Sequence, residues 1–343
     1  MRVTSSMMIK TMNYNLQKNL TNMNDMYNQM STGKSFNEAS QNPVGAAKSI
    51  KYTSYLMEIE QYQANANDAV SRLSVTESSI NSVEELLEKT RELTVQAANE
   101  TLSDEDRLAI LSEIGEIQEQ LLEVGNATYA GESLFGGYNI GSQPFTHDSD
   151  NLLMYNDGYI NLEGPYDASM SDADIEALYT LHAGEAILDD SSSENMIYHI
   201  GENSEVDVNV EGHELFGVGE SSVFSVVDKI AMALEGKETY KVVENGVVVE
   251  KTLDLSDLIG EIDDSLEAVR STKAEVGAKS GYVNMSLNRL NQDHYTYTAL
   301  LSSNEDADIA QVSMYLANAE TVYSASLSAG SKIIMPSLVD FIG

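Results

Sequence analysis

The sequence predicts a mainly α-helical protein, in which long N- and C-terminal segments form one helical bundle and a small α+β, β-rich domain is inserted between them. Three observations favour this fold class. Apolar residues at both ends recur every three or four positions, the spacing of one helix face. The middle carries short Val- and Tyr-rich runs around turn sequences. Residues 141–260 hold 25 acidic and four basic side chains, whereas both ends are nearly neutral.

The composition excludes several kinds of partner and chemistry. The net charge of −36 repels nucleic-acid phosphates and anionic lipid headgroups, so we expect no nucleic acid and no membrane as partner. No apolar run approaches the ~20 residues that span a bilayer. The short apolar run at residues 7–9 predicts that there is no Sec-type signal peptide. The absence of cysteine excludes disulfides, thiolate metal sites and a cysteine nucleophile.

The N-terminal third reads as three helices. The first has a stripe of apolar residues with helical spacing, at Ile9, Met12, Leu16, Leu20, Met23, Met26 and Met30. Gly33 is expected to end it, and a second helix is expected from about residue 43 to 100. Ser103, followed by acidic residues, is typical of the N-cap of a third helix that ends near residue 124.

The middle segment contains hairpin and cap signals. The turn sequence Asn-Asp-Gly at residues 156–158 and the pair Asn-Gly at 245–246 each lie between strand-like runs, which predicts two β-hairpins. Residues 206–210 are another strand candidate. Ser171 is expected to cap a short helix that reaches about residue 179.

Helical spacing returns from about residue 256 to 301, and Ser303 with Asp306 is expected to cap a restart. The last helix has its apolar stripe at Ile309, Val312, Leu316, Ala319 and Tyr323. We therefore expect three regions. These are coiled-coil-like terminal helices (1–42 with 303–343), a helical bundle (43–140 with 256–302) and an acidic, outward-facing insert (141–255).

No pattern of residues indicates an active site. No two of the five histidines have the i, i+4 spacing of a zinc protease, and neither a phosphate-binding loop nor a Gly-x-Ser-x-Gly elbow occurs. Pairs of carboxylates are expected by chance among 55 acidic residues and read as solvated surface. The sequence predicts a protein that is not an enzyme, with no catalytic, cofactor-binding or metal-binding residues.

Several ordered motifs at both ends resemble the bacterial flagellin family. They are Met-Ser-Thr-Gly-Lys at 30–34, Ala-Ser-Gln-Asn-Pro-Val-Gly-Ala-Ala at 39–47, Gly-Glu-Ser-Leu-Phe-Gly-Gly at 131–137 and Asn-Glu-Asp-Ala-Asp at 304–308. The resemblance covers roughly residues 1–140 and 260–343 and leaves the middle unmatched, as the variable region of the family would be. Asn42 stands where the family usually has Asp, and Ser35 where it usually has a basic residue.

The resemblance implies a structural subunit of the bacterial flagellum, secreted unfolded through the type III export channel. The ending at residues 335–342 is similar to that of the members that join hook and filament. The implied partners are the adjacent hook-associated junction protein, flagellin, copies of the chain in a ring, and a cytoplasmic export chaperone on the C-terminal helix.

The resemblance also implies that the terminal helices are disordered in the monomer and pair on polymerisation. Their expected assembly interface consists of Ile9, Met12, Leu16, Met23, Met30, Ile309, Val312, Leu316, Ala319 and Tyr323. Two alternatives stay open: a short flagellin, and a secreted adhesin or enzyme on a flagellin-like export scaffold. An intracellular coiled-coil scaffold would not explain the ordered motifs at both ends.

Overall fold

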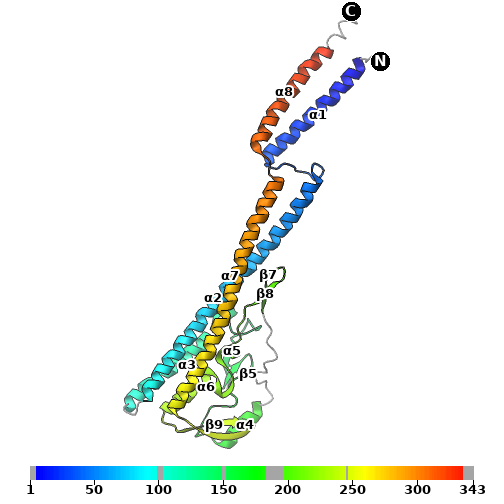
Figure 1. Cartoon of the computed structure of the whole chain (residues 1–343). Coiled ribbons are helices and arrows are strands. Elements are labelled where there is room, and N and C mark those ends of the chain that lie inside the picture. The colour runs from blue at the N-terminus through cyan, green and yellow to red at the C-terminus, as the bar shows by residue number, and fades with distance from the viewer. Residues whose placement is uncertain (1–4, 99–102, 149–151, 183–195, 245, 335–343) are drawn as a thin grey trace, which may run out of the picture. The chain divides into compact units, whose positions relative to one another are not determined.

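The computed structural model describes residues 5–98, 103–148, 152–182, 196–244 and 246–334. Its contacts divide the chain into two compact units, residues 1–61 with 290–343 and residues 62–289. In both units, helices from the N-terminal part of the sequence lie beside helices from the C-terminal part (Figure 1). The second unit also contains the β-rich part of the chain.

Five long helices account for most of the chain, and the prediction of a mainly α-helical protein is confirmed. They are α1 (Ser5–Thr32), α2 (Pro43–Ala97), α3 (Asp104–Gly125), α7 (Leu255–Glu305) and α8 (Ile309–Ile334). None of the helices in the described part of the chain is long and apolar enough to cross a membrane.

In the first unit, α1 packs along α8, and the start of α2 packs against the end of α7 (Figure 1). Gly33 ends α1 in a left-handed conformation with φ +73°, and its N–H donates to the carbonyl oxygen of Gln29 at 2.9 Å. This is the glycine stop that the sequence predicts, because a residue without Cβ adopts positive φ at little cost.

In the second unit, α2, α3 and α7 share an aliphatic core. Its fully buried members include Leu73, Ile80, Val83 and Leu87 of α2, Ile114, Ile117 and Leu121 of α3, and Ile262, Leu266, Val269, Val276 and Val283 of α7. Ion pairs flank this core: Glu84 accepts from Arg270 at 2.6 Å and from Lys273 at 2.8 Å. The long-helix pairing therefore rests on aliphatic burial, with charge pairs at its edge.

Short strands and helices fill the rest of this unit, where the expected β-rich insert is confirmed. The elements are β1 (Thr128–Tyr129), β2 (Glu132–Ser133), β3 (Phe145–His147), β4 (Leu153–Tyr155), β5 (Gly158–Tyr159), β6 (Tyr166–Asp167), α4 (Asp172–His182), β7 (Ile197–Gly201), β8 (Ser204–Asp207), α5 (Gly212–Phe216), η2 (Gly219–Ser221), α6 (Val223–Leu234), β9 (Thr239–Glu244) and β10 (Val247–Thr252). The sheet orders are β1-β2, β3-β4-β5, β7-β8 and β10-β9-β6, and all pairs are antiparallel.

Both predicted hairpins form. Asn156 and Asp157 take φ values of 47° and 68° between β4 and β5, as a turn with two left-handed residues requires. Gly246, with φ 79°, lies between β9 and β10. The cap signals at Ser103 and Ser171 also precede helices, α3 and α4.

Three local predictions were wrong or incomplete. Helix α6 was not foreseen, although its apolar residues Val223, Val226, Val227, Ile230 and Leu234 recur at helical spacing. Its Val-rich composition is also typical of strands. The expected strand at 206–210 is β8, which ends at Asp207. The restart near Ser303 is misplaced: α7 continues to Glu305, and Asp308 caps α8 by accepting from the N–H of Gln311 at 3.1 Å.

The two compact units neither confirm nor contradict the three regions expected from the sequence. Their boundaries fall inside α2 and α7, which run without a break from one unit into the other. The regions 1–42 with 303–343, 43–140 with 256–302, and 141–255 therefore stay predictions, as does disorder of the terminal helices in the monomer.

Candidate assembly surfaces

The breaks between α1 and α2 and between α7 and α8 are bonded to each other within the first unit. The N–H of Ser35 donates to the carbonyl oxygen of Glu305 at 2.6 Å, and the N–H of Ala307 donates to that of Gly33 at 2.8 Å. The ammonium of Lys34 lies 2.7 Å from Oε2 of Glu305. The Met-Ser-Thr-Gly-Lys motif, with the adjacent Ser35, and the Asn-Glu-Asp-Ala-Asp motif thus form one joint between the two ends of the sequence.

The start of α2 belongs to the same joint. Oδ1 of Asn42 accepts from the N–H of Gly45 at 2.9 Å and so caps α2, with Pro43 in the first helical turn. The family's usual Asp would use the same oxygen type, so the Asn42 departure leaves the cap intact. Nδ2 of Asn304 donates to the carbonyl oxygen of Gly45 at 2.9 Å and to Oγ of Ser49 at 2.7 Å.

The joint perturbs one titratable group. The hydrogen bond from Lys34, opposed by partial burial, holds the pKa of Glu305 below its usual value. Glu305 is therefore ionised at neutral pH, and its bond to Lys34 is a charge-assisted one.

Eight of the ten predicted interface residues lie at buried or half-buried positions of the paired helices α1 and α8. Val312 and Leu316 are buried, and Ile9, Met12, Leu16, Met23, Ala319 and Tyr323 are half-buried. Met30 and Ile309 are exposed. At the far end of the pair, a Cβ on Gly330 would lie 2.7 Å from Sδ of Met12, so the absence of a side chain there accommodates the thioether. The predicted stripe is thus largely used within the subunit.

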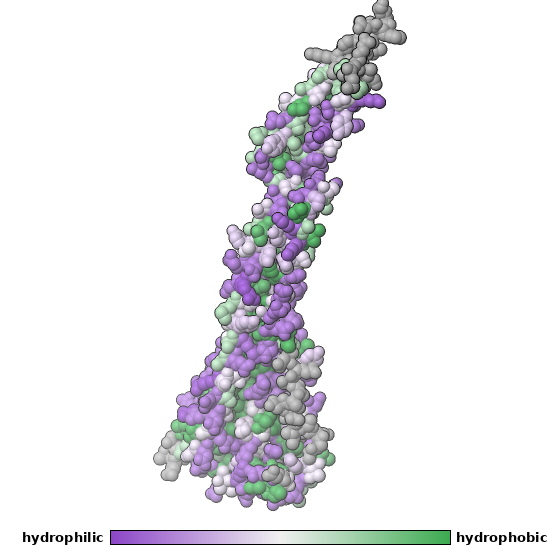
Figure 2. Space-filling view, turned by 45° about the vertical axis from the view of Figure 1, so that its right-hand side comes forward, coloured by the Kyte–Doolittle hydropathy of each residue, from purple (hydrophilic) through white to green (hydrophobic). Residues whose placement is uncertain are grey.

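A second set of apolar side chains on the same helices faces outward and is exposed. It comprises Met7, Met8, Tyr14, Leu20, Tyr27 and Met30 of α1 and Ile309, Met314, Tyr315, Val322 and Leu327 of α8. Over the terminal helices in Figure 2, green apolar patches are mixed with purple polar ones. Exposed apolar residues in this density are typical of a surface that another molecule covers. Sequence reasoning missed most of them, because it followed one stripe per helix.

The paired stretches of α2 and α7 next to the joint also have exposed apolar side chains. Ile50 and Met57 of α2 and Tyr295 of α7 are exposed. The ring of Tyr297 packs against that of Tyr55, with centroids 5.3 Å apart, on the same pair of helices. A two-helix stretch cannot bury apolar residues on every side, so these remain available to neighbours.

The first unit, which has these exposed apolar residues, carries little net charge, and the second unit carries most of it. The first unit has ten acidic and seven basic residues, a net charge of −3, whereas the second unit has 45 acidic and 12 basic residues, a net charge of −33. The apolar outer surfaces thus lie in the nearly neutral unit, and the second unit supplies the charge that opposes non-specific association.

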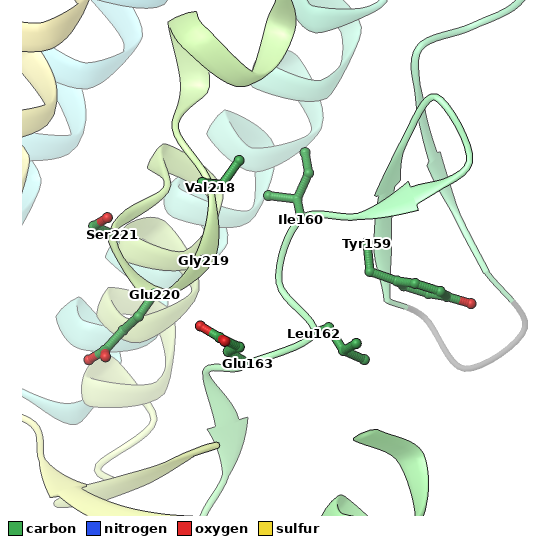
Figure 3. A pocket seen from close by; sticks show the side chains of 8 residues that line it. All are labelled: Tyr159, Ile160, Leu162, Glu163, Val218, Gly219, Glu220 and Ser221. Atoms are coloured by element: carbon green, nitrogen blue, oxygen red, sulfur yellow. The ribbon is translucent and has the colours of Figure 1, made fainter. Parts of the chain in front are cut away.

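A hollow of about 360 Å³ lies in the second unit (Figure 3). It is lined by Tyr159, Ile160, Leu162, Glu163, Val218, Gly219, Glu220 and Ser221. Glu220 is held by Nζ of Lys251 at 2.7 Å and by the hydroxyl of Tyr240, which ties η2 to the β9–β10 hairpin. Ser221 has no histidine among these lining residues to act as a base, so the hollow offers carboxylates without a nucleophile–base pair.

A second hollow, of about 540 Å³, is lined in part by a carboxyl group with a raised pKa, that of Asp228. Asp228 of α6 accepts from Nε2 of Gln118 of α3 at 2.5 Å. Burial raises the pKa of Asp228 to about 6, against the smaller opposite effect of that hydrogen bond. Within the described ranges, no group of three or more metal-ligating side chains occurs, here or elsewhere.

Comparison with known proteins agrees with this geometry. Residues 3–140 match the bacterial flagellin N-terminal helical region. The chain is 27% identical to flagellar hook-associated protein 3 of Escherichia coli K12 over 88% of its length and 87% of that protein. It is 24% identical to polar flagellin F of Vibrio parahaemolyticus over 86% of its length and 87% of that protein.

The solved structure of hook-associated protein 3 from Legionella pneumophila superimposes with a TM-score of 0.55 at 15% identity, covering 74% of this chain and 97% of that one. The chain therefore has the fold of the flagellar hook-associated proteins. Its N-terminal part is similar to the N-terminal helical region of the bacterial flagellins.

Proposed function

We propose that the chain is a structural subunit of the bacterial flagellum that forms the junction between hook and filament. The observation that carries this proposal is the outward-facing apolar set on α1 and α8, in a chain similar over most of its length to a hook-associated protein 3.

The geometry suggests how assembly would proceed. Pairing of α1 with α8 uses the predicted stripe, and contact between neighbours uses the outward-facing set. Each 100 Å² of apolar surface removed from water contributes about 2.5 kcal/mol before the cost of ordering is subtracted. Helices that are marginal alone would gain order as neighbouring subunits cover them.

The partners follow from this position in the flagellum. Copies of the chain would form a ring, with an adjacent hook-associated junction protein on one side and flagellin on the other. The acidic insert at 141–255 would face outward, where its charge keeps subunits apart before assembly. In the cytoplasm, an export chaperone would cover the C-terminal helix before secretion. The motif at 335–342 that favours the junction branch lies outside the described residues.

A short flagellin is the second candidate, because the chain also aligns with a polar flagellin over 86% of its length. A secreted enzyme or adhesin has weaker support. Its chemistry would have to reside in the insert, where the hollow of Figure 3 places no histidine beside Ser221.

Deletion of the gene in its own bacterium tests the proposal. Electron microscopy of the cells and detection of flagellin in the medium are the two readouts. Hooks without filaments, with flagellin shed into the medium, are the expected result. Loss of flagellin itself would establish the second candidate, and intact motile filaments would contradict both.

A further inference from the structure

Sulfur is concentrated on the terminal helices. The chain has no cysteine, and α1 alone contains six of its 15 methionines, Met7, Met8, Met12, Met23, Met26 and Met30. The same helix has only two leucines, Leu16 and Leu20. Leucine would serve an aliphatic helix face equally well in volume and helix propensity. The excess of methionine therefore brings something that leucine lacks: a polarisable, oxidisable thioether.

Four thioethers of the terminal helices belong to the outward-facing set. Met7, Met8 and Met30 of α1 are 61%, 44% and 45% exposed, and Met314 of α8 is 56% exposed. Met12 and Met23, by contrast, are half-buried against the paired helix. Oxidants in solution therefore reach the outer thioethers more readily than the inner ones.

Met30 also links the two helices. The hydroxyl of Ser313 on α8 lies 3.8 Å from Sδ of Met30 on α1, within hydrogen-bonding reach of a sulfur acceptor. Oxidation of this sulfur would change a contact inside the pair as well as the surface outside it.

We propose that Met7, Met8, Met30 and Met314 form an oxidation-sensitive site through which peroxide or hypochlorous acid blocks assembly of the subunit. This inference rests on the proposed function. Each thioether sulfur is oxidised to a sulfoxide by one oxygen atom: hydrogen peroxide leaves as water, and hypochlorous acid leaves as chloride and a proton. The reaction takes place on the subunit before assembly, while these side chains are exposed.

Oxidation should weaken assembly because a sulfoxide is more polar than a thioether. A sulfoxide oxygen is a strong hydrogen-bond acceptor, and covering it without a donor carries the penalty of any unpaired buried polar group. Each sulfoxide covered in assembly should raise the concentration needed for assembly by about tenfold. Methionine sulfoxide reductases reverse the reaction, so the block is a reversible one.

Met285 of α7 provides a matched control. It is 67% exposed, so it should oxidise as readily as the four, but it lies in the second unit, outside the terminal helices. A difference between Met285 and the four residues therefore separates a local effect on the terminal helices from general oxidative damage.

The experiment uses the full chain treated with hydrogen peroxide. Peptide mass spectrometry identifies the oxidised methionines, and sedimentation measures self-association. We expect oxidation of the four outer residues ahead of Met12 and Met23, and loss of assembly in the unsubstituted chain and in Met285→Leu. The fourfold variant Met7→Leu, Met8→Leu, Met30→Leu, Met314→Leu should keep its assembly after treatment. Reductases A and B together should restore the treated unsubstituted chain.

Two results would overturn the inference alone: assembly that is unchanged once the four residues are oxidised, or a fourfold variant as sensitive as the unsubstituted chain. Circular dichroism before treatment checks that the variants are folded. An untreated chain that does not self-associate at any concentration would contradict the proposed function, and the inference with it.

Discussion

The side-chain amide of Asn304 donates to the carbonyl oxygen of Gly45, 2.9 Å away and 259 positions earlier in the sequence. The same amide donates to Oγ of Ser49 at 2.7 Å, so one residue of α7 holds the first two turns of α2. This contact closes the joint at which the terminal helices meet the rest of the first unit.

Replacing Asn304 with Ala should lower the free energy of unfolding of the first unit by about 1–2 kcal/mol, because both acceptors lose a partly buried donor. Asn318→Ala, at an exposed position of α8, is the matched control and should change it by less than about 0.5 kcal/mol. Hydrogen exchange of the amides at the start of α2 measures the local effect. Equal protection in the two variants would show that the contact does not stabilise the joint.

Gly45→Ala should be destabilising by about 1–3 kcal/mol, since a Cβ there would lie 2.8 Å from Cγ of Asn42 and 2.9 Å from the Phe36 ring. Gly281→Ala in α7 should have the opposite sign. Its Cβ would meet nothing within 4 Å, and alanine is the better helix former by about 0.5–1 kcal/mol. Thermal unfolding followed by circular dichroism compares them; a stabilised Gly45→Ala would refute the packing described at the joint.

Substitutions at Leu316 and Val322 of α8 should distinguish helix pairing within the subunit from contact between subunits. Leu316 is buried and Val322 is 51% exposed. Leu316→Asp places a charge between the paired helices and should cost about 2–4 kcal/mol, reducing both helicity and assembly. Val322→Asp should leave the helicity of the subunit unchanged and still block assembly. Circular dichroism and sedimentation give the two readouts, and normal assembly of Val322→Asp would remove the role assigned to the outward-facing set.

Asp228 should make the second unit less stable as the pH rises. Burial raises its pKa in the folded chain to about 6, above the ordinary value of 3.8. Its contribution is therefore fully favourable below about pH 4 and is lost as the pH rises through 6. Asp228→Asn should remove this dependence and raise the stability at pH 8 by about 2 kcal/mol. Urea unfolding at pH 5 and pH 8 tests it; the same pH slope in both proteins would rule out Asp228 as the cause.

The long helices could be predicted because their signals are local and repeated. Gly33, Pro43 and the Ser103 cap each mark a helix end by backbone requirements that tertiary packing does not alter. The turns at Asn156 and Gly246 were predictable for the same reason, since left-handed residues favour Asn, Asp and Gly.

The remainder depends on contacts between distant residues. Helix α6 has helical spacing, but its valines are equally typical of a strand, and its packing against α3 decides between the two. The partition of apolar residues between the inner and outer faces of α1 and α8 was also hidden. Two adjacent stripes on one helix look like one broad stripe until the partner helix is placed. The bonds of Asn304 required knowledge of which segment meets the start of α2.

Immunogold electron microscopy tests the central proposal most directly. An epitope tag inserted at the exposed Gly141, in the acidic second unit, would mark the subunit in flagella of the native bacterium without altering the terminal helices. The proposal predicts a narrow band of gold where hook meets filament, in cells whose motility is unchanged. Gold along the whole filament would contradict the junction role and identify the chain as a filament subunit.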